Sequence, residues 1–234
     1  MKLRPFFSYF GSKWRATARY SEPKYNLIIE PFAGSAGYSL NYSDRQIKLY
    51  DLDPVICGLW EYLIKTTEYE IMHLPSWVED VRYLPGTVCQ EAKWLIGFHL
   101  NRVSTRPRNQ VTRWSYENET TTAYWNQRTQ VLIANQLKHI RHWKVFNKSY
   151  KYIDNQTATW FVDPPYQKDY GKFYIKNVID YNHLGVFCRE RLGQVIVCEN
   201  AGADWLPFKP FKIINTVQRY KGAISYEVVW TNER

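Results

Sequence analysis

The chain has 234 residues, 45% of them apolar, which suits one domain, or one domain with a large insertion, and excludes a chain that is disordered throughout. Its net charge is +9, and the segment 93–151 carries eleven Lys/Arg against two Asp/Glu, so the rest of the chain is neutral. Such a basic block favours a polyanionic partner, with nucleic acid ahead of an anionic membrane surface, and a solvated basic face is the alternative.

The first half of the chain predicts a loop and a helix, then two strands that are each followed by a helix. Residues 5–20 begin as a loop and then have helical spacing, and 26–43 give an apolar run, a turn of small residues and a helix from about Ala36. Residues 47–54 predict a short strand that ends in acids, and 55–65 predict a helix.

The second half continues the alternation of strands and helices. Asp180 is expected to cap one of its helices and Gly193 to end it, while the threonines before residue 123 can cap another. The expected elements are helices at 91–100, 123–140 and 181–192, a loop or short hairpin at 101–122, strands at 143–150, 159–163 and 194–200, and a hairpin over 211–232 around "YKGAIS". The order predicts a doubly wound α/β sheet with a C-terminal antiparallel hairpin and an inserted basic region.

Cysteine usage and hydropathy indicate where such a chain would work. The cysteines Cys57, Cys89, Cys188 and Cys198 form no CxxC pair and have no histidines at metal-ligand spacing. We therefore expect reduced core thiols, no metal site and a cytoplasmic monomer. We also expect neither a signal peptide nor a membrane span.

Three polar segments follow predicted strands, where ligands bind in doubly wound sheets. They are "EPFAGSAG" (30–37), "YDLDP" (50–54) and "DPPY" (163–166). The first offers small residues and free N–H groups at a helix start, and Asp51 or Asp53 can accept hydrogen bonds from ribose hydroxyls. Because G-x-G-x-x-G and a Walker lysine are absent, a nucleoside cofactor without a pyrophosphate fits better than a dinucleotide, and an ordinary tight turn is the alternative.

The segment "DPPY" offers acceptors for an amino group. An exocyclic amine of a base needs acceptors for its two hydrogens before it can attack a methyl group, and the Asp163 carboxylate and the Pro164 carbonyl can supply them. Tyr166 can stack on a base flipped out of a duplex. The alternative is a Pro-rich turn, and Lys168, Tyr170 and Tyr174 either close over the base or belong to a loop with no chemistry.

In this order of motifs the chain resembles the Dam-type (α-group) adenine-N6 DNA methyltransferases. The resemblance rests on "GSK" (11–13), "EPFAGSAG", the acid after the second strand, an inserted target-recognition region and "DPPY", and it covers about 5–60, 94–102 and 143–230. It implies a Rossmann-like methyltransferase sheet, with 1–65 and 143–234 as the S-adenosylmethionine-binding catalytic domain and 66–142 as the recognition insert. It also implies DNA as partner, S-adenosylhomocysteine as product and no metal.

The resemblance assigns roles to individual residues. It implies a catalytic role for Asp163, Pro164 and Tyr166, and cofactor binding by Tyr9, Lys13, Glu30, Phe32, Gly34, Asp51 and Asp163. The family usually has tryptophan at the position of Tyr9 and glycine at the positions of Ser12 and Ala36. In the insertion, "FHLNR" (98–102) resembles the start of the family's specificity hairpin, but the glycine-rich sequence expected next is replaced by "VSTRPRNQVTRW".

This departure prevents transfer of the target sequence, which could be relaxed. The arginines available for DNA binding are Arg102, Arg106, Arg108 and Arg113, which could read guanines or, as we favour for most of them, hold phosphates. Alternatives to adenine-N6 methylation are cytosine-N4 or RNA-base methylation and a catalytically inactive DNA-binding relative. Asp163 disfavours the protein-amide substrates of related "NPPY" enzymes. The preference for single or double strands and the role in restriction, phage self-protection or regulation stay open.

Overall fold

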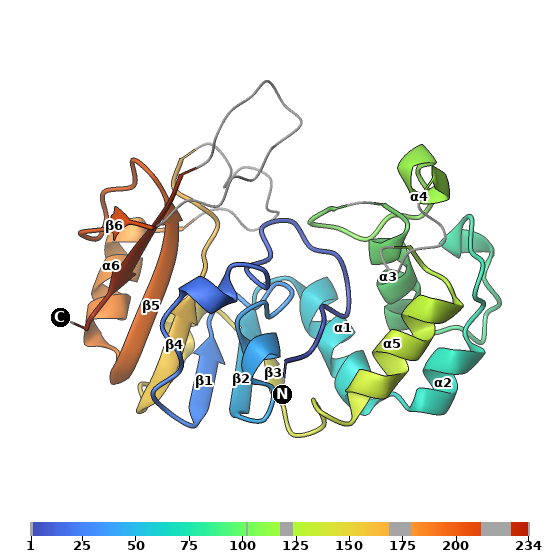
Figure 1. The fold of residues 1–234 in the computed structure, drawn as a ribbon, viewed down its shortest axis with the longest axis horizontal. Coiled ribbons are helices and arrows are strands. Elements are labelled where there is room, and N and C mark those ends of the chain that lie inside the picture. The colour runs from blue at the N-terminus through green and yellow to red at the C-terminus, as the bar shows by residue number, and fades with distance from the viewer. Residues whose placement is uncertain (1, 102, 118–123, 169–178, 212–225, 234) are drawn as a thin grey trace.

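The computed structural model describes residues 2–101, 103–117, 124–168, 179–211 and 226–233, and they are built around one seven-stranded sheet (Figure 1). The strand order is β3-β2-β1-β4-β5-β7-β6. The strands are β1 (Leu27–Glu30), β2 (Gln46–Asp51), β3 (Lys144–Asn147), β4 (Ala158–Val162), β5 (Gly193–Asn200), β6 (Lys209–Pro210) and β7 (Glu227–Thr231). The first five are parallel, whereas β7 runs antiparallel to both β5 and β6. The predicted α/β class is confirmed as a mostly parallel mixed sheet.

Both faces of the central strands are buried, which explains their nearly continuous apolar sequence. Successive residues enter different hydrophobic clusters: Ile28 belongs to one and Ile29 to the other, and Phe161 and Trp160 divide in the same way. Helix α1 packs in the first cluster and α6 in the second, so the sheet lies between two layers. The β6–β7 pair adds the expected antiparallel edge, while "YKGAIS" lies outside the described residues.

The helices begin where the sequence supplies a cap. Asp53 accepts a hydrogen bond from Val55 N (2.9 Å) before α1, and Pro54 is its first residue. Asp180 caps α6 through His183 N (3.1 Å), as predicted. The helices are α1 (Pro54–Lys65), α2 (Glu68–His73), α3 (Gln90–His99), α4 (Arg113–Glu117), α5 (Gln127–Leu137) and α6 (Tyr181–Glu190), with 3₁₀ turns at Thr17–Arg19, Ser39–Tyr42, Val81–Tyr83 and Tyr150–Tyr152.

Several local predictions are wrong. The helices expected within 5–20 and from Ala36 are only 3₁₀ turns. In the second of them, Gly34 and Ala36 have φ of +43° and +50°, which delays the turn until Ser39. Helix α6 ends at Glu190, and Gly193, with φ of +97°, instead begins β5, where a Cβ would lie 2.2 Å from Ala158 O.

The inserted segment 66–142 contains helices α2 to α5, which group at the opposite end of the molecule from α6 in Figure 1. Most of its buried side chains belong to the hydrophobic cluster that also contains α1 and one face of the sheet. The insertion therefore shares a core with the layer of the fold that contains α1. Asn126, rather than a threonine, caps α5 by accepting from Thr129 N (2.9 Å). The division into a catalytic domain and a recognition insert stays a prediction.

The cysteines are all free, but only three of them are core thiols. Cys57, Cys188 and Cys198 are buried as expected, whereas Cys89 is exposed at the N-cap of α3. That prediction is therefore wrong for Cys89, because the short loop before α3 keeps this position at the surface.

Candidate active site

A cavity of about 350 Å³ opens at the carboxyl ends of β1, β2 and β4, within the size range of ligand pockets. Its wall includes every residue that the sequence suggested for cofactor binding, namely Tyr9, Lys13, Glu30, Phe32, Gly34, Asp51 and Asp163. These residues come from sequence positions more than 150 apart, and the parallel strands bring them together. Their binding roles stay predictions.

The turn after β1 is shaped by Gly34. Its φ of +43° favours glycine, and a Cβ there would lie 2.9 Å from the ring of Tyr9, so the ring packs directly on the backbone. Asp51 Oδ2 accepts a hydrogen bond from Gly34 N (3.0 Å), and its Oδ1 accepts from Asp53 N (2.9 Å). Trp60 Nε1 donates to Gly34 O (2.9 Å). The acid expected to meet the cofactor therefore also fixes the cofactor turn.

Burial changes the acid–base properties of this end of the cavity. Glu30 is only 2% exposed and accepts from Ser39 N (2.8 Å). Burial raises the pKa of Glu30 to about 8, and it raises the pKa of Asp51 to about 6 against the hydrogen bonds that lower it. Phe32 is half-buried, with its ring 5.5 Å from that of Tyr150. The cavity therefore combines an aromatic wall with acids that hold protons more tightly than usual.

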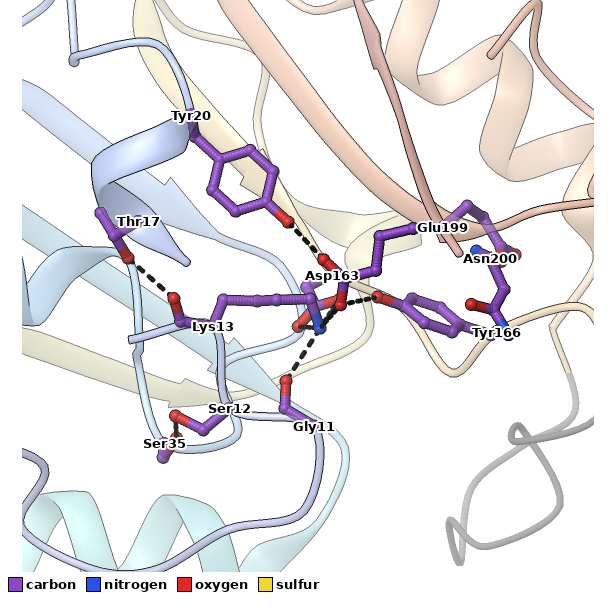
Figure 2. A network of polar contacts seen from close by, with 11 residues as sticks. Gly11, Ser12, Lys13, Thr17, Tyr20, Ser35, Asp163, Tyr166, Glu199 and Asn200 are labelled. Atoms are coloured by element: carbon purple, nitrogen blue, oxygen red, sulfur yellow. Dashed lines mark hydrogen bonds and ion pairs between the residues drawn. The ribbon is translucent and has the colours of Figure 1, made fainter. Parts of the chain in front are cut away.

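Lys13 and Asp163 form a close ion pair in the cavity (Figure 2). Lys13 Nζ lies 2.9 Å from Asp163 Oδ1 and 3.0 Å from Oδ2, and it donates a further bond to Gly11 O (2.8 Å). Burial acts to lower the pKa of Lys13, but the negative charge of Asp163 and its neighbours raises it well above the usual value. Burial raises the pKa of Asp163 to about 6, although Lys13 opposes the rise. The pairing thus favours the charged form of Lys13, whose hydrogen bonds orient the Asp163 carboxylate.

The rest of the "DPPY" segment surrounds this pair. Pro164 is buried, and Pro165 O accepts a bond from Tyr181 Oη (2.7 Å), which fixes the loop against α6. The ring of Tyr166 lies 5.0 Å from Lys13 Nζ, a cation–π contact. The structure thus gives Tyr166 a polar contact inside the protein, while its stacking on a base stays a prediction. Lys168 is exposed, and Tyr170 and Tyr174 lie outside the described residues.

Two parts of the site were missed by the sequence analysis. The segment after β3, with Tyr150 and the exposed Tyr152, forms one side of the cavity, and the rule that ligands bind at carboxyl ends of strands could have found it. Glu227 on β7 contacts Tyr20, Tyr166 and Lys13 at 3.2, 3.5 and 3.9 Å. Only the tertiary structure brings Glu227 to Asp163, so no local motif marks it.

The candidate DNA-binding arginines lie away from these buried contacts. Arg106, Arg108 and Arg113 are exposed, and Arg113 pairs with Glu117 on the same helix (3.2 Å), while Arg102 lies outside the described residues. Their loop reaches the cavity through Thr105, which is part of its wall. None of these three arginines is part of the cavity wall, and Arg106 is the one next to Thr105 in the chain.

The described parts of the chain contain no group of three or more His, Cys, Asp or Glu residues that could hold a metal ion. None of the helices described is long and apolar enough to cross a membrane.

No family model matches the chain. A protein named DNA adenine methylase, from Haemophilus influenzae (strain ATCC 51907 / DSM 11121 / KW20 / Rd), is 23% identical over 189 residues. That match covers 71% of this chain and 65% of the relative, so the chain spans less than two thirds of the relative's length. A solved structure described as a conserved hypothetical protein of Streptococcus pyogenes has a TM-score of 0.36 and 12% identity, covering 88% of this chain and 86% of that one.

Proposed function

We propose that this chain is an S-adenosylmethionine-dependent methyltransferase that acts on the N6 amino group of adenine in DNA. The observation that carries the proposal is that Asp163 of "DPPY", oriented by Lys13, opens into the same cavity as the Gly34 turn and Asp51. The similarity to a DNA adenine methylase supports the class of reaction, and the seven-stranded sheet is compatible with a Rossmann-like methyltransferase.

The residues around the cavity fit the methyl donor. Asp51 and Asp53 present carboxylates beside the glycine turn, where ribose hydroxyls can donate hydrogen bonds to them. The ring of Tyr9 packs against the backbone of Gly34, which has no side chain. Asp163 adds a negative charge that suits a cationic ligand. Tyr9, Lys13, Glu30, Phe32, Gly34, Asp51 and Asp163 would therefore hold the donor. When bound, S-adenosylmethionine supplies a methyl group on a positively charged sulfur.

The chain's own contribution to the reaction is orientation of the amino group. The Asp163 carboxylate and the Pro164 carbonyl would accept the two hydrogens of the amine, so that its lone pair points at the methyl carbon. Lys13 fixes the Asp163 carboxylate, and its positive charge favours the ionised form of that group. Each carboxylate oxygen retains a free lone pair with which it can accept a hydrogen bond from the amine. Tyr166 would face the base, which must be flipped out of the duplex to reach this depth.

The insertion would bind the DNA backbone. Arg106, Arg108 and Arg113 are exposed, and the segment that carries Arg106 and Arg108 adjoins Thr105 in the cavity wall, so their side chains are available to bind phosphates. Phosphate contacts of this kind position a duplex without reading its sequence. The geometry therefore supports DNA as the partner and leaves the target sequence to be measured.

Incubation of plasmid DNA and, in parallel, of RNA with methyl-labelled S-adenosylmethionine, followed by nucleoside analysis, tests the proposal. The expected product is N6-methyladenine, and mapping it on a plasmid of known sequence gives the target site. Label found in N4-methylcytosine, or in RNA but not in DNA, would show that the substrate differs from the one we propose. If no nucleoside is labelled and calorimetry detects no heat of S-adenosylmethionine binding, the chain is an inactive DNA-binding relative.

A further inference from the structure

Glu227 stands beside the proposed reaction centre although it is distant from every motif in the sequence. It is the first residue of β7 and pairs with Asn200 at the carboxyl end of β5, two strands from Asp163. Its backbone carbonyl accepts a bond from Phe211 N (3.1 Å), and the Phe211 ring stacks on Tyr20 at 4.4 Å. The antiparallel strand β7 thus delivers this carboxylate to the cavity end of a sheet that is otherwise parallel.

The side chain of Glu227 links three residues around Asp163. Tyr20 Oη donates to Oε2 (3.2 Å) and Tyr166 Oη donates to Oε1 (3.5 Å), while Lys13 Nζ is 3.9 Å from Oε1. Figure 2 shows Tyr20, Lys13 and Tyr166 converging on the Asp163 region from three directions. The Glu227 side chain is only 17% exposed. A carboxylate so little exposed must be matched by donors and a cation, and these three residues supply them.

We propose that Glu227 is a positioning residue of this site, which holds Lys13 and Tyr166 in place and adds a second negative charge beside Asp163. The inference rests on the proposed function and extends it. The formal charges of Lys13, Asp163 and Glu227 add up to −1, which suits a reaction in which positive charge moves onto the amino nitrogen.

The charge balance of methyl transfer explains why a second carboxylate, that of Glu227, would help the reaction. As the nitrogen–carbon bond forms, the carbon–sulfur bond breaks and its electron pair stays on sulfur, which becomes neutral while the nitrogen becomes cationic. The nitrogen then releases a proton, which Asp163 can accept and pass to solvent. Because Lys13 neutralises one carboxylate, only a second one leaves the centre negative enough to favour the cation and receive the proton.

The protonation behaviour of the centre agrees with this arrangement. Burial raises the pKa of Asp163, Lys13 lowers it, and the charge of Glu227 raises it further. Burial lowers the pKa of Lys13, whereas Asp163, Tyr166 and Glu227 raise it. The other titratable groups facing this centre are Tyr20, Tyr166, Cys198, Glu199 and Glu30. Burial raises the pKa of all five, that of Glu30 to about 8, so the tyrosines and the thiol stay neutral, and Lys13 stays charged, at neutral pH. Asp163 is therefore the group whose titration should follow the charge at Glu227.

Glu227→Gln tests the inference because it keeps the size of the side chain and removes its charge. We expect kcat to fall about tenfold, and the acid limb of the pH profile of kcat/KM to move about one pH unit lower, since Asp163 loses a neighbouring negative charge. Tyr20→Phe removes one hydrogen bond but no charge, so its acid limb should match wild type. Glu233→Gln, which removes an acid paired with Lys24 outside the cavity, is the matched control.

A carboxyl titration of the free protein by NMR separates this inference from the proposed function. The Asp163 carboxyl should titrate at lower pH in Glu227→Gln than in wild type, whatever the substrate. An unchanged Asp163 titration, or an acid limb that moves equally in Tyr20→Phe, would overturn the charge role and leave Glu227 as a structural residue. Wild-type protein that transfers no methyl group to nucleic acid would instead overturn the proposed function, and with it the catalytic part of the inference.

Discussion

The cavity end of the sheet and the basic loop of the insertion use charge in opposite ways. In the cavity, Lys13 and Asp51 each have short contacts to fixed partners, at 2.8–3.0 Å. In the loop, Arg106 and Arg108 are exposed to solvent. Buried partners fix geometry, which chemistry at one atom requires, whereas exposed cations attract any polyanion. The difference predicts that single substitutions in the cavity cause large losses of methyl transfer, whereas single substitutions of the exposed arginines each cause a small loss of DNA affinity.

Asp163→Ala should show the largest effect. We expect methyl transfer to fall by about 10³-fold or more, because the amino group loses its charged acceptor. The fold should persist, since Glu227 remains close to the buried Lys13. Steady-state transfer of labelled methyl groups, with circular dichroism to verify folding, measures this. Asp204→Ala is the matched control, because Asp204 bonds to Gln167 next to the motif without contacting Lys13. Wild-type turnover in Asp163→Ala would remove Asp163 from the mechanism.

Glu30→Gln should change the stability of the fold in a pH-dependent manner. Because the pKa of Glu30 is about 8 when folded against 4.5 ordinarily, the folded protein holds this proton more tightly, and its stability falls as pH rises between those values. At pH 7 the unfolding free energy is lower than at acid pH by about 3 kcal/mol, since each pH unit above 4.5 contributes about 1.36 kcal/mol. Glutamine keeps an acceptor for Ser39 N and should remove this slope.

Urea unfolding at pH 5, 6, 7 and 8 measures the slope of the unfolding free energy against pH for wild type and Glu30→Gln. The pKa values of Asp51 and Asp163, both raised to about 6, act in the same direction below pH 6, so a smaller slope should remain there in the variant. Equal slopes in the two proteins between pH 6 and 8 would show that Glu30 ionises freely.

Gly34→Ala tests how tightly the turn is built. The side chain would meet a φ of +43° and the Tyr9 ring at 2.9 Å, so we expect a loss of about 1–2 kcal/mol of unfolding free energy and weaker S-adenosylmethionine binding. Thermal unfolding and calorimetry measure the two effects. Gly86→Ala is the matched control, since nothing lies within 4 Å of its Cβ position. Equal behaviour of the two variants would show that the turn adapts to a side chain.

The cavity could be predicted from sequence where local patterns and the rule for parallel sheets coincide. Gly34 and Asp163 follow strands that the apolar runs already indicated, Asp51 is the last residue of another, and parallel strands end at one edge. Glu227 could not be predicted, because its place depends on the antiparallel register of β7 with β5. The helix expected from Ala36 failed because two positive φ values override helical spacing, which sequence periodicity does not record.

The insertion was harder to predict for a physical reason. Its helix α2 is only six residues long and is held by a capping box between Thr67 and Glu70, a signal too short for periodicity to reveal. Its loops are fixed by distant backbone bonds, such as Val111 N to Glu79 O (2.8 Å). Charge, in contrast, needs no geometry to be recognised, so the basic segment was evident from composition.

The loop arginines should show the smallest effects, and these should be gradual. Arg106→Ala, Arg108→Ala and Arg113→Ala should each weaken DNA binding a few-fold and reduce the slope of log K against log salt by about 1, because each removes one phosphate contact. Fluorescence anisotropy with duplexes of different sequence, over a range of salt concentrations, measures this. Arg189→Ala on α6, an exposed arginine outside the insertion, is the matched control and should leave the slope unchanged.

These slopes also decide between the two roles left open for the arginines. An arginine that holds a phosphate loses affinity equally for all duplexes, whereas one that reads a guanine loses affinity chiefly for the sequence containing it. Arg113 should show the weakest effect of the three, because its pair with Glu117 already offsets part of its charge. If DNA binding by the wild type did not depend on salt, the contrast drawn here between the cavity and the insertion would be wrong. The insertion would then hold DNA by fixed contacts like those of the cavity.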